Sequence, residues 1–301
     1  MTAEIETGLM RGCIVRGRGG LYTVRDETGT EWTLRAKKKF RRQGISPLVG
    51  DRVLFTPGHI SDEHGWVEEI ETRDSVFVRP PVANVSMICA VVSCVPETDW
   101  LLVDKLLYAA DRQKVKAVIA VTKCDVDQEE TAAYASRCYR GICPVFPVSG
   151  REGTGLDALR DVFAGQAVCF AGQSGAGKST LLNAMYALQA ETGEISEKIA
   201  RGKNTTRHTE LFLTASGAVF DTPGFNLLES EEIMEPEALQ LGYPDFAPYR
   251  GKCYFDPCCH QSEPGCAVKD AVKRGEIDPD RYGRYLRILD SCRVNWRNRY
   301  D

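Results

Sequence analysis

The residues best suited to chemistry lie in the stretch Gly172–Ser179, which reads GQSGAGKS and fits the phosphate-binding pattern G-x-x-x-x-G-K-[ST] at every fixed position. The apolar residues 167–171 before it predict a short buried strand, and residues 180–185 after it predict a helix. In this context, glycines let backbone N–H groups form an anion site at a helix N-terminus. We therefore predict a nucleotide-binding loop made of Gly172, Gln173, Ser174, Gly175, Ala176, Gly177, Lys178, Ser179 and Thr180.

A second stretch could read the base. The tetrapeptide Thr122-Lys123-Cys124-Asp125 follows the apolar run 117–121 and is similar to the guanine-reading motif N-K-x-D. The Asp125 carboxylate would accept from N1–H and the 2-amino group of guanine. Adenine presents a lone pair at N1, and a polar group left unpaired costs about 1–3 kcal/mol. Thr122 replaces the usual Asn and offers one hydroxyl on a shorter side chain, which leaves open whether it bonds to the base edge or to the phosphate loop.

Other residues are predicted to surround the nucleotide. Lys178 would reach the β- and γ-phosphates, and the Ser179 hydroxyl would bind Mg²⁺. Ser149 follows a short strand and begins a segment that resembles the backbone loop touching the guanine oxygen.

Two more segments are predicted to act as switches. The sequence Asp221-Thr222-Pro223-Gly224 has the D-x-x-G arrangement, in which Asp221 would reach Mg²⁺ through water and the Gly224 N–H would sense the γ-phosphate. The polar stretch 201–208 is typical of a switch loop, and Thr205 or Thr206 would complete the Mg²⁺ shell.

The order of these motifs is unusual. In ordinary GTPases the guanine-reading motif follows the phosphate loop, whereas here it precedes it. A parallel sheet carries its ligand loops at the carboxyl ends of its strands, so the site survives relocation of the chain termini. The sequence therefore predicts a circularly permuted GTPase. Because the strand ending at Asp221 leads into the C-terminal region, we also hypothesise that switch movement passes to that region through the chain.

A metal site is predicted near the C-terminus. The chain has twelve cysteines, and its first six residues do not resemble a signal peptide, which favours reduced thiols or metal over disulfides. Three thiolates and one imidazole form a closed tetrahedral Zn²⁺ set. The predicted ligands are Cys253, Cys258, His260 and Cys266; the adjacent Cys259 has poorer spacing.

Composition limits the other functions. The 301 residues carry a net charge of −4, so a surface that binds RNA must be local. One candidate is residues 37–42, where Phe40 lies among five basic residues and could stack on a base, although a solvated loop is the alternative. The other is the arginine-rich segment 281–299, as an RNA-facing or a solvated helix face. No apolar run approaches the ~20 residues of a membrane span, so we expect no membrane association.

The predicted architecture is multidomain. Residues 1–74 predict an all-β barrel of the five-stranded OB type, because short alternating strands flank turn residues. Residues 75–240 predict an α/β permuted GTPase domain that begins after an extended connector. Residues 241–301 predict a small helical zinc-binding domain.

Together these segments closely resemble the ribosome small-subunit-dependent GTPase family of the RsgA type. The resemblance rests on Val49–Val53, which reads VGDRV, on the motif order, and on the cysteine cluster with EPGCAV at residues 263–268. It implies a bacterial cytoplasmic enzyme that hydrolyses GTP to GDP and phosphate late in small-subunit maturation. It further implies Mg²⁺ with GTP, one structural Zn²⁺, and rRNA contacts through the barrel and the zinc domain. The protein would bind the immature subunit in the GTP state and leave after hydrolysis stimulated by the subunit. We expect a monomer.

The group that positions the attacking water is also predicted from the resemblance. Phe225 stands where many GTPases place a Gln, and in this family a histidine directly before paired threonines is the suspected substitute. This chain has Asn204 there, which leaves His208 as the candidate. Thr205 and Thr206, one of which would complete the Mg²⁺ shell, are the other predicted catalytic residues. We therefore expect slow intrinsic hydrolysis.

Two other functions fit the same residues. An RNA-binding scaffold controlled by GTP would depend on the basic segments, with hydrolysis incidental. An ATPase with a degenerate specificity motif would fit Thr122 and would bind ATP independently of Asp125.

Overall fold

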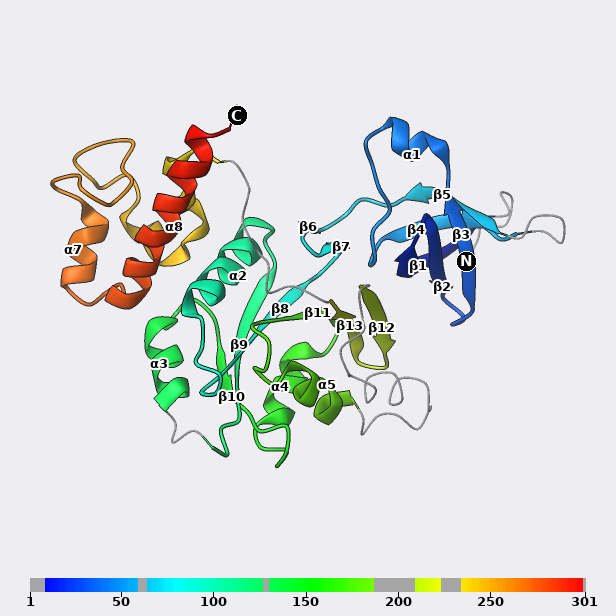
Figure 1. Cartoon of the computed structure of the whole chain (residues 1–301), viewed down its shortest axis with the longest axis horizontal. Coiled ribbons are helices and arrows are strands. Elements are labelled where there is room, and N and C mark those ends of the chain that lie inside the picture. The colour runs from blue at the N-terminus through cyan, green and yellow to red at the C-terminus, as the bar shows by residue number, and fades with distance from the viewer. Residues whose placement is uncertain (1–8, 59–63, 127–129, 187–208, 223–233, 300–301) are drawn as a thin grey trace. The chain divides into compact units, whose positions relative to one another are not determined.

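The computed structural model describes residues 9–58, 64–126, 130–186, 209–222 and 234–299 (Figure 1). The chain divides into two compact units. The first comprises Met1–Ser86, Phe163–Phe170 and Gly202–Phe225; the second comprises Met87–Val162, Ala171–Arg201 and Asn226–Asp301.

The first unit contains the predicted five-stranded barrel, which is confirmed. Its strands are β1 (Met10–Arg18), β2 (Leu21–Asp26), β3 (Glu31–Ala36), β4 (Arg52–Thr56) and β5 (Gly65–Ile70). The pairings β1–β2, β2–β3, β3–β5, β5–β4 and β4–β1 close the barrel. Alternate side chains point inward, so that Ile14, Val24, Leu34, Phe55 and Val67 are fully buried.

The VGDRV motif has a structural explanation in this barrel. Gly50 has a φ of +94°, and a Cβ added there would lie 2.1 Å from the Ala83 carbonyl oxygen. The Asp51 side chain is fully buried and accepts from the Leu48 N–H at 2.7 Å and from the Arg73 guanidinium at 2.7 and 2.8 Å. A glycine and an aspartate are thus required here by backbone space and by buried hydrogen bonds.

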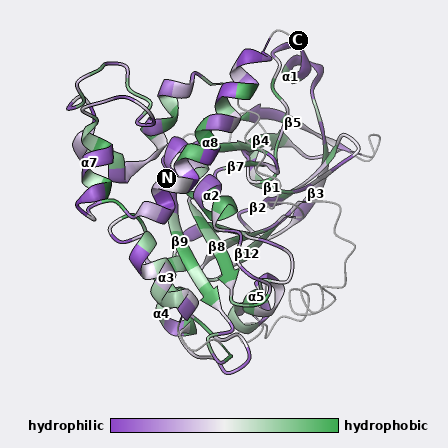
Figure 2. Cartoon of the chain, turned by 60° about the vertical axis from the view of Figure 1, so that its left-hand side comes forward, coloured by the Kyte–Doolittle hydropathy of each residue, from purple (hydrophilic) through white to green (hydrophobic). Residues whose placement is uncertain are grey.

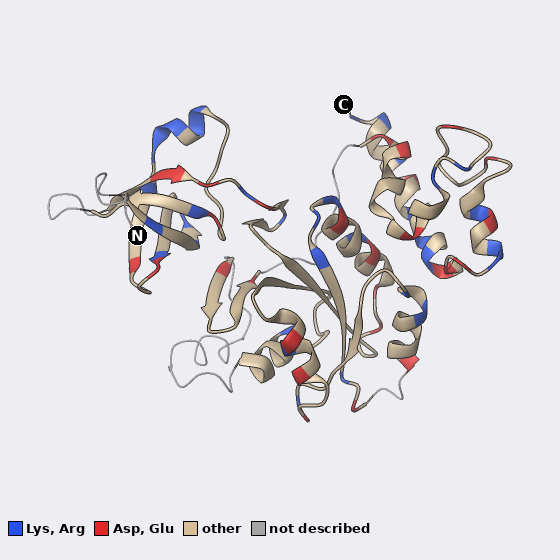
Figure 3. Cartoon of the chain, turned by 180° about the vertical axis from the view of Figure 1, so that it is seen from behind, with Lys and Arg blue, Asp and Glu red and all other residues tan. Residues whose placement is uncertain are grey.

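Two predictions for this unit are wrong. Residues 38–42 form a short helix, α1 (Lys38–Arg42), instead of a loop. The helix turns Phe40 inward, where it is 5% exposed, so this ring is not available to stack on a base. Its basic neighbours remain exposed, and they colour most of α1 blue in Figure 3. The connector is a hairpin of β6 (Val76–Val78) and β7 (Pro81–Ala83), not an extended segment.

Three further strands belong to the first unit. β11 (Gln166–Ala171) pairs in parallel with β13 (Gly217–Asp221), and β12 (Glu210–Thr214) pairs antiparallel with β13. β12 also meets β1 at the pair Arg16 and Glu210. β11 leads into the predicted phosphate loop, and β13 ends at the predicted switch residue Asp221.

The second unit contains the parallel strands β8 (Met87–Ser93), β9 (Lys116–Thr122) and β10 (Val145–Pro147), in the order β10-β9-β8. All seven residues of β8 are buried, and Figure 2 shows β8 and β9 as hydrophobic. A strand covered on both faces is apolar throughout, which explains the continuous run in the sequence. The helices of this part are α2 (Trp100–Arg112), α3 (Glu130–Cys138), α4 (Leu156–Phe163) and α5 (Lys178–Tyr186).

The C-terminal part of the second unit is helical. It comprises the 3₁₀ helices η3 (Pro236–Gly242) and η4 (Pro244–Tyr249) and the helices α7 (Ala267–Lys273) and α8 (Pro279–Arg297). Tyr108 of α2 is buried in one apolar cluster with Tyr243, Phe246 and Tyr285. Helices α2 and α8 lie side by side (Figures 1 and 3). Within the described residues, no helix is both long enough and apolar enough to span a bilayer.

Two arginines of α8 face neither RNA nor solvent, the two roles predicted for this segment. Arg281 and Arg284 are 1% and 7% exposed, and both donate to the fully buried carboxylate of Asp104 on α2. Arg281 also makes a bidentate contact with Asp245, at 3.1 and 3.2 Å. Burial lowers the pKa of both arginines, but the Asp104 charge more than offsets it and raises their pKa above the usual value. These residues therefore dock α8 onto α2 instead of facing RNA or solvent.

Candidate functional site

The phosphate loop joins β11 to α5 and has the backbone geometry that its glycines permit. Gly172 has a φ of +141°, and a Cβ there would lie 2.2 Å from the Val91 carbonyl oxygen. Lys178 donates to the carbonyl oxygens of Gly172 at 2.6 Å and Gln173 at 2.8 Å, so its ammonium lies over the loop. Burial lowers the pKa of Lys178. Ser179 and Thr180 are exposed in the first turn of α5, where Ser179 can reach a magnesium ion.

The Gln173 side chain fastens this loop to the start of α2. Its amide nitrogen donates to the Glu97 carbonyl at 2.7 Å, and its amide oxygen accepts from the Asp99 N–H at 2.7 Å. Asp99 in turn caps α2 by accepting from the N–H groups of Leu101 and Leu102. The sequence predicted Gln173 only as a member of the loop; its side-chain contacts depend on a segment far away in the chain.

Thr122 contacts the phosphate loop. Its side chain is buried, and its hydroxyl oxygen lies 2.5 Å from the Ala176 carbonyl oxygen and 3.1 Å from that of Val92. Both neighbours are acceptors, so the single hydroxyl proton is used within the protein. Of the two contacts that the sequence left open, the structure has the one to the loop.

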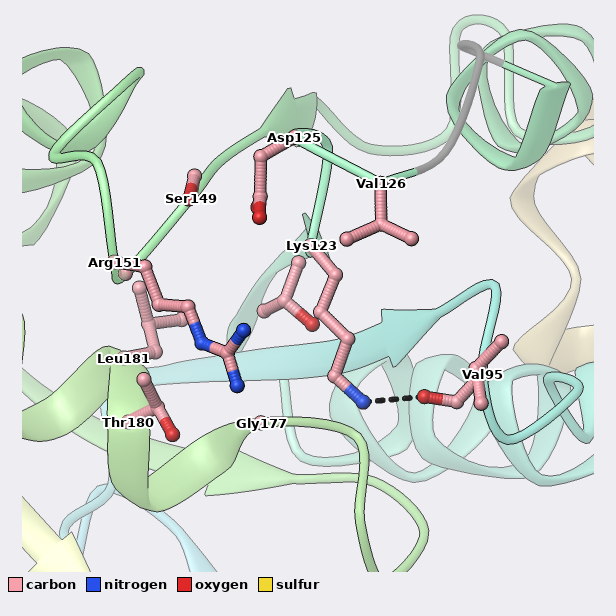
Figure 4. A pocket seen from close by; sticks show the side chains of 11 residues that line it. Val95, Lys123, Asp125, Val126, Ser149, Arg151, Gly177, Thr180 and Leu181 are labelled. Carbon is pink, nitrogen blue, oxygen red and sulfur yellow. Dashed lines mark hydrogen bonds between the residues drawn. The ribbon is translucent and has the colours of Figure 1, made fainter.

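Lys123 bridges the same loop to the segment after β8. Its ammonium donates to the Gly175 carbonyl at 2.9 Å and to the Val95 carbonyl (Figure 4). Lys123 has a φ of +61°. Cys124 contributes through its backbone, which donates to the Val148 carbonyl at 3.3 Å.

These residues surround a cavity of about 300 Å³, which is large enough for a purine base. Its lining residues are Val95, Thr122, Lys123, Asp125, Val126, Ser149, Gly150, Arg151, Gly177, Thr180 and Leu181. In Figure 4 the Asp125 carboxylate and the Arg151 side chain both point into this cavity. Sequence reasoning missed Val95, Val126, Arg151 and Leu181 as lining residues. Of these residues, only Arg151 could have been suspected from the sequence, because it is a charged residue two positions after Ser149.

Ser149 fixes the loop on one side of the cavity. It is fully buried, its N–H donates to the Thr154 carbonyl at 3.0 Å, and its hydroxyl accepts from the Glu152 N–H at 3.2 Å. Gly150 packs closely on α5, because a Cβ there would lie 3.2 Å from the Thr180 carbonyl oxygen. These contacts hold the turn whose residues Ser149, Gly150 and Arg151 line this side of the cavity.

The predicted switch residues are only partly described. Asp221 ends β13 in the first unit, and burial raises the pKa of its carboxyl group. The next residue, Thr222, lies with its hydroxyl 3.6 Å from the Cys169 sulfur. Thr205, Thr206, His208 and Gly224 lie outside the described residues, so their roles stay predictions.

The four predicted metal ligands lie together. The sulfur atoms of Cys253, Cys258 and Cys266 and a ring nitrogen of His260 are all within 4.8 Å of one another. Cys253 Sγ is 3.9 Å from Cys266 Sγ and 3.6 Å from His260 Nδ1, close to the ~3.7 Å edge of a tetrahedron with zinc–ligand bonds of about 2.0–2.3 Å. Burial raises the pKa of the Cys258 thiol, and a bound cation would lower it by favouring the thiolate. This cluster can hold a metal ion.

Gln240 on η3 orients the histidine of this cluster. Its amide oxygen lies 2.8 Å from His260 Nε2, and its amide nitrogen donates to the Cys258 carbonyl at 3.2 Å. Because Nε2 carries the proton that is donated to Gln240, Nδ1 is unprotonated. Nδ1 faces the sulfur atoms, as a metal ligand requires. Gln240 was not predicted, because it lies outside the cysteine spacing that defines the motif.

Known proteins of similar sequence match nearly the whole chain. The chain matches the family model of the RsgA GTPase over residues 70–231 and that of the RsgA N-terminal domain over residues 11–67. It is 41% identical to the small ribosomal subunit biogenesis GTPase RsgA of Ruminiclostridium cellulolyticum, with 94% of this chain and 93% of that protein covered. It is 39% identical to the small ribosomal subunit biogenesis GTPase RsgA 1 of Listeria monocytogenes, with 97% and 100% covered.

Two solved structures share the fold. YjeQ from Thermotoga maritima superposes with a TM-score of 0.80 at 33% identity, covering 94% of this chain and 98% of that one. YloQ, described as a circularly permuted GTPase, superposes with a TM-score of 0.77 at 30% identity, covering 98% of each chain. The predicted fold class, including the permuted order of the motifs, is thereby confirmed.

Proposed function

The chain belongs to the RsgA GTPase family and is a GTP hydrolase, and on this premise we propose that it acts in the cytoplasm in late maturation of the small ribosomal subunit. It binds the immature subunit and its rRNA in the GTP state, hydrolyses GTP when the subunit stimulates it, and then leaves. The names of its relatives support this role, since they are small ribosomal subunit biogenesis GTPases.

The observation that carries the nucleotide part of the proposal is the cavity between the guanine motif and the phosphate loop. Thr122 and Lys123 each bond to a carbonyl of the loop, and the Asp125 carboxylate faces the space between them. Base and phosphates therefore bind to one preorganised body. GTP brings Mg²⁺, held through the Ser179 hydroxyl, and the Cys3His cluster holds one structural Zn²⁺.

The positive charge of α1 supports the proposed partner, the rRNA of the small subunit. Lys38, Lys39, Arg41 and Arg42 of α1 are exposed, and a local basic surface suits phosphate contacts of rRNA in a chain with a net charge of −4. The same helix favours the second candidate function, an RNA-binding scaffold in which hydrolysis is incidental. In that case the subunit would bind without changing turnover.

Turnover of GTP by the full-length protein, alone and with purified small subunits, tests the proposal. We expect slow turnover alone, strong stimulation by small but not large subunits, and loss of both in Lys178→Ala. The matched control is Lys116→Ala, an exposed lysine at the opposite end of β9 from the guanine motif. Subunit binding with unchanged turnover would favour the scaffold instead, and fast turnover by the free protein would contradict the need for a partner.

A further inference from the structure

A cavity that binds guanine has to pair with hydrogen-bond donors on one edge of the base and with acceptors on the other. Asp125 accepts from the N1–H and 2-amino donors, but guanine also presents two acceptors, O6 and N7. By its resemblance to the loop that touches the guanine oxygen, the Ser149 segment would contact O6 through its backbone. The N7 side needs a side-chain donor, and in the motif N-K-x-D the Asn amide stands at the position held here by Thr122.

The residues of the guanine motif cannot supply that donor. The Thr122 proton is used on backbone carbonyls, with the Ala176 oxygen at 2.5 Å. The Lys123 ammonium donates to the carbonyls of Gly175 and Val95. Both side chains thus hold the phosphate loop in place, and in Figure 4 the Lys123 ammonium points to Val95, away from the Asp125 carboxylate.

Arg151 is placed to take this role. Its side chain is exposed, and among the described residues no hydrogen-bond or ion-pair partner is found for its guanidinium. In Figure 4 the guanidinium extends across the cavity toward Gly177 and Thr180. This is the side on which the Thr122 hydroxyl lies, because a Cβ on Gly177 would be 3.1 Å from that oxygen.

We propose that Arg151 is a specificity residue whose guanidinium donates to the N7 and O6 acceptors of guanine. Its planar fork of N–H groups fits these two neighbouring acceptors, as in arginine–guanine pairs elsewhere. Adenine has a 6-amino donor in place of O6 and would repel the same fork. Together with Asp125, Arg151 therefore reads guanine from both edges. This inference rests on the proposed guanine-nucleotide site.

The test is a cycle of two proteins and two ligands. The affinities of GDP and 7-deaza-GDP, which lacks the N7 acceptor, are measured by calorimetry for the full-length protein and for Arg151→Ala. We expect Arg151→Ala to weaken GDP binding about 5- to 100-fold, the range for one good arginine–guanine contact. We expect 7-deaza-GDP, which keeps O6, to bind the unaltered protein more weakly than GDP does, and Arg151→Ala to bind both ligands alike.

The controls separate the inference from its premise. Arg140→Ala removes an exposed arginine that does not line the cavity and should leave all affinities unchanged. Equal GDP affinity of Arg151→Ala and the unaltered protein would overturn the inference alone. The inference would also be overturned if 7-deaza-GDP bound more weakly than GDP by the same factor in both proteins. The affinity lost in Arg151→Ala would then come from charge near the phosphates. Failure of the unaltered protein to bind GDP would overturn the proposed function as well.

Discussion

Replacing Asp104 by Asn should destabilise the docking of α8 onto α2. Asn preserves the size of the side chain but removes a charge that is fully buried between two guanidinium groups. Arg281 would keep its bidentate contact with Asp245. Among the described residues, Arg284 would keep only tyrosine hydroxyls, those of Tyr134 at 2.9 Å and Tyr139 at 3.3 Å. One buried cation would thus lose its only carboxylate within the described part of the chain, which costs about 3–5 kcal/mol.

Hydrogen exchange of the backbone amides in α2 and α8, read by mass spectrometry, measures this loss locally. A cost of about 3–5 kcal/mol corresponds to exchange roughly 10²- to 10³-fold faster or more, at about 1.4 kcal/mol per factor of ten. The matched control is Asp111→Asn, an exposed aspartate on the same helix, for which we expect a change within about 0.5 kcal/mol. If α8 in Asp104→Asn exchanged no faster than in this control, the ion-pair cluster would not be what holds the helix.

Two further predictions concern single hydrogen bonds. Thr122→Val keeps the shape but leaves the Ala176 carbonyl without its donor, so GDP affinity measured by calorimetry should fall about 5- to 100-fold, from a cost of about 1–3 kcal/mol. Thr122→Ser should restore it, and unchanged affinity in the Val variant would contradict the tether. Gln240→Leu removes the partner of His260 Nε2 and should weaken zinc binding about 10- to 100-fold in competition with a chromophoric chelator. Zinc affinity equal to that of the unaltered protein would exclude this role.

The sequence predicted what depends on neighbouring residues. Gly172 at a φ of +141° and the helix that starts at Lys178 are consequences of a short contiguous stretch, so the phosphate loop was recognisable from its pattern. The same holds for the cluster from Cys253 to Cys266, whose spacing is set by one loop. The alternating strands of the barrel were predicted for the same reason.

Features that depend on distant partners were not predictable. Arg281 contacts Asp104, which lies 177 residues earlier in the sequence. The basic sequence of α8 does not show that a carboxylate on another helix pairs with it. Phe40 lies among five charged residues, yet one helical turn suffices to bury it. Arg151 looked like an ordinary loop residue, because only the folded cavity shows where its side chain points.

The contacts between α2 and the C-terminal helices affect how this protein can be dissected. Tyr108 packs so closely on η3 that a Cβ on Gly242 would lie 2.3 Å from its ring. A chain truncated before η3 would expose that ring and would leave Asp104 without its arginines. Activity lost on such truncation could therefore come from the lost contacts of α2, next to the Gln173 anchor, without any catalytic group having been removed. Point substitutions in the intact chain are the sound way to ask what the zinc segment does.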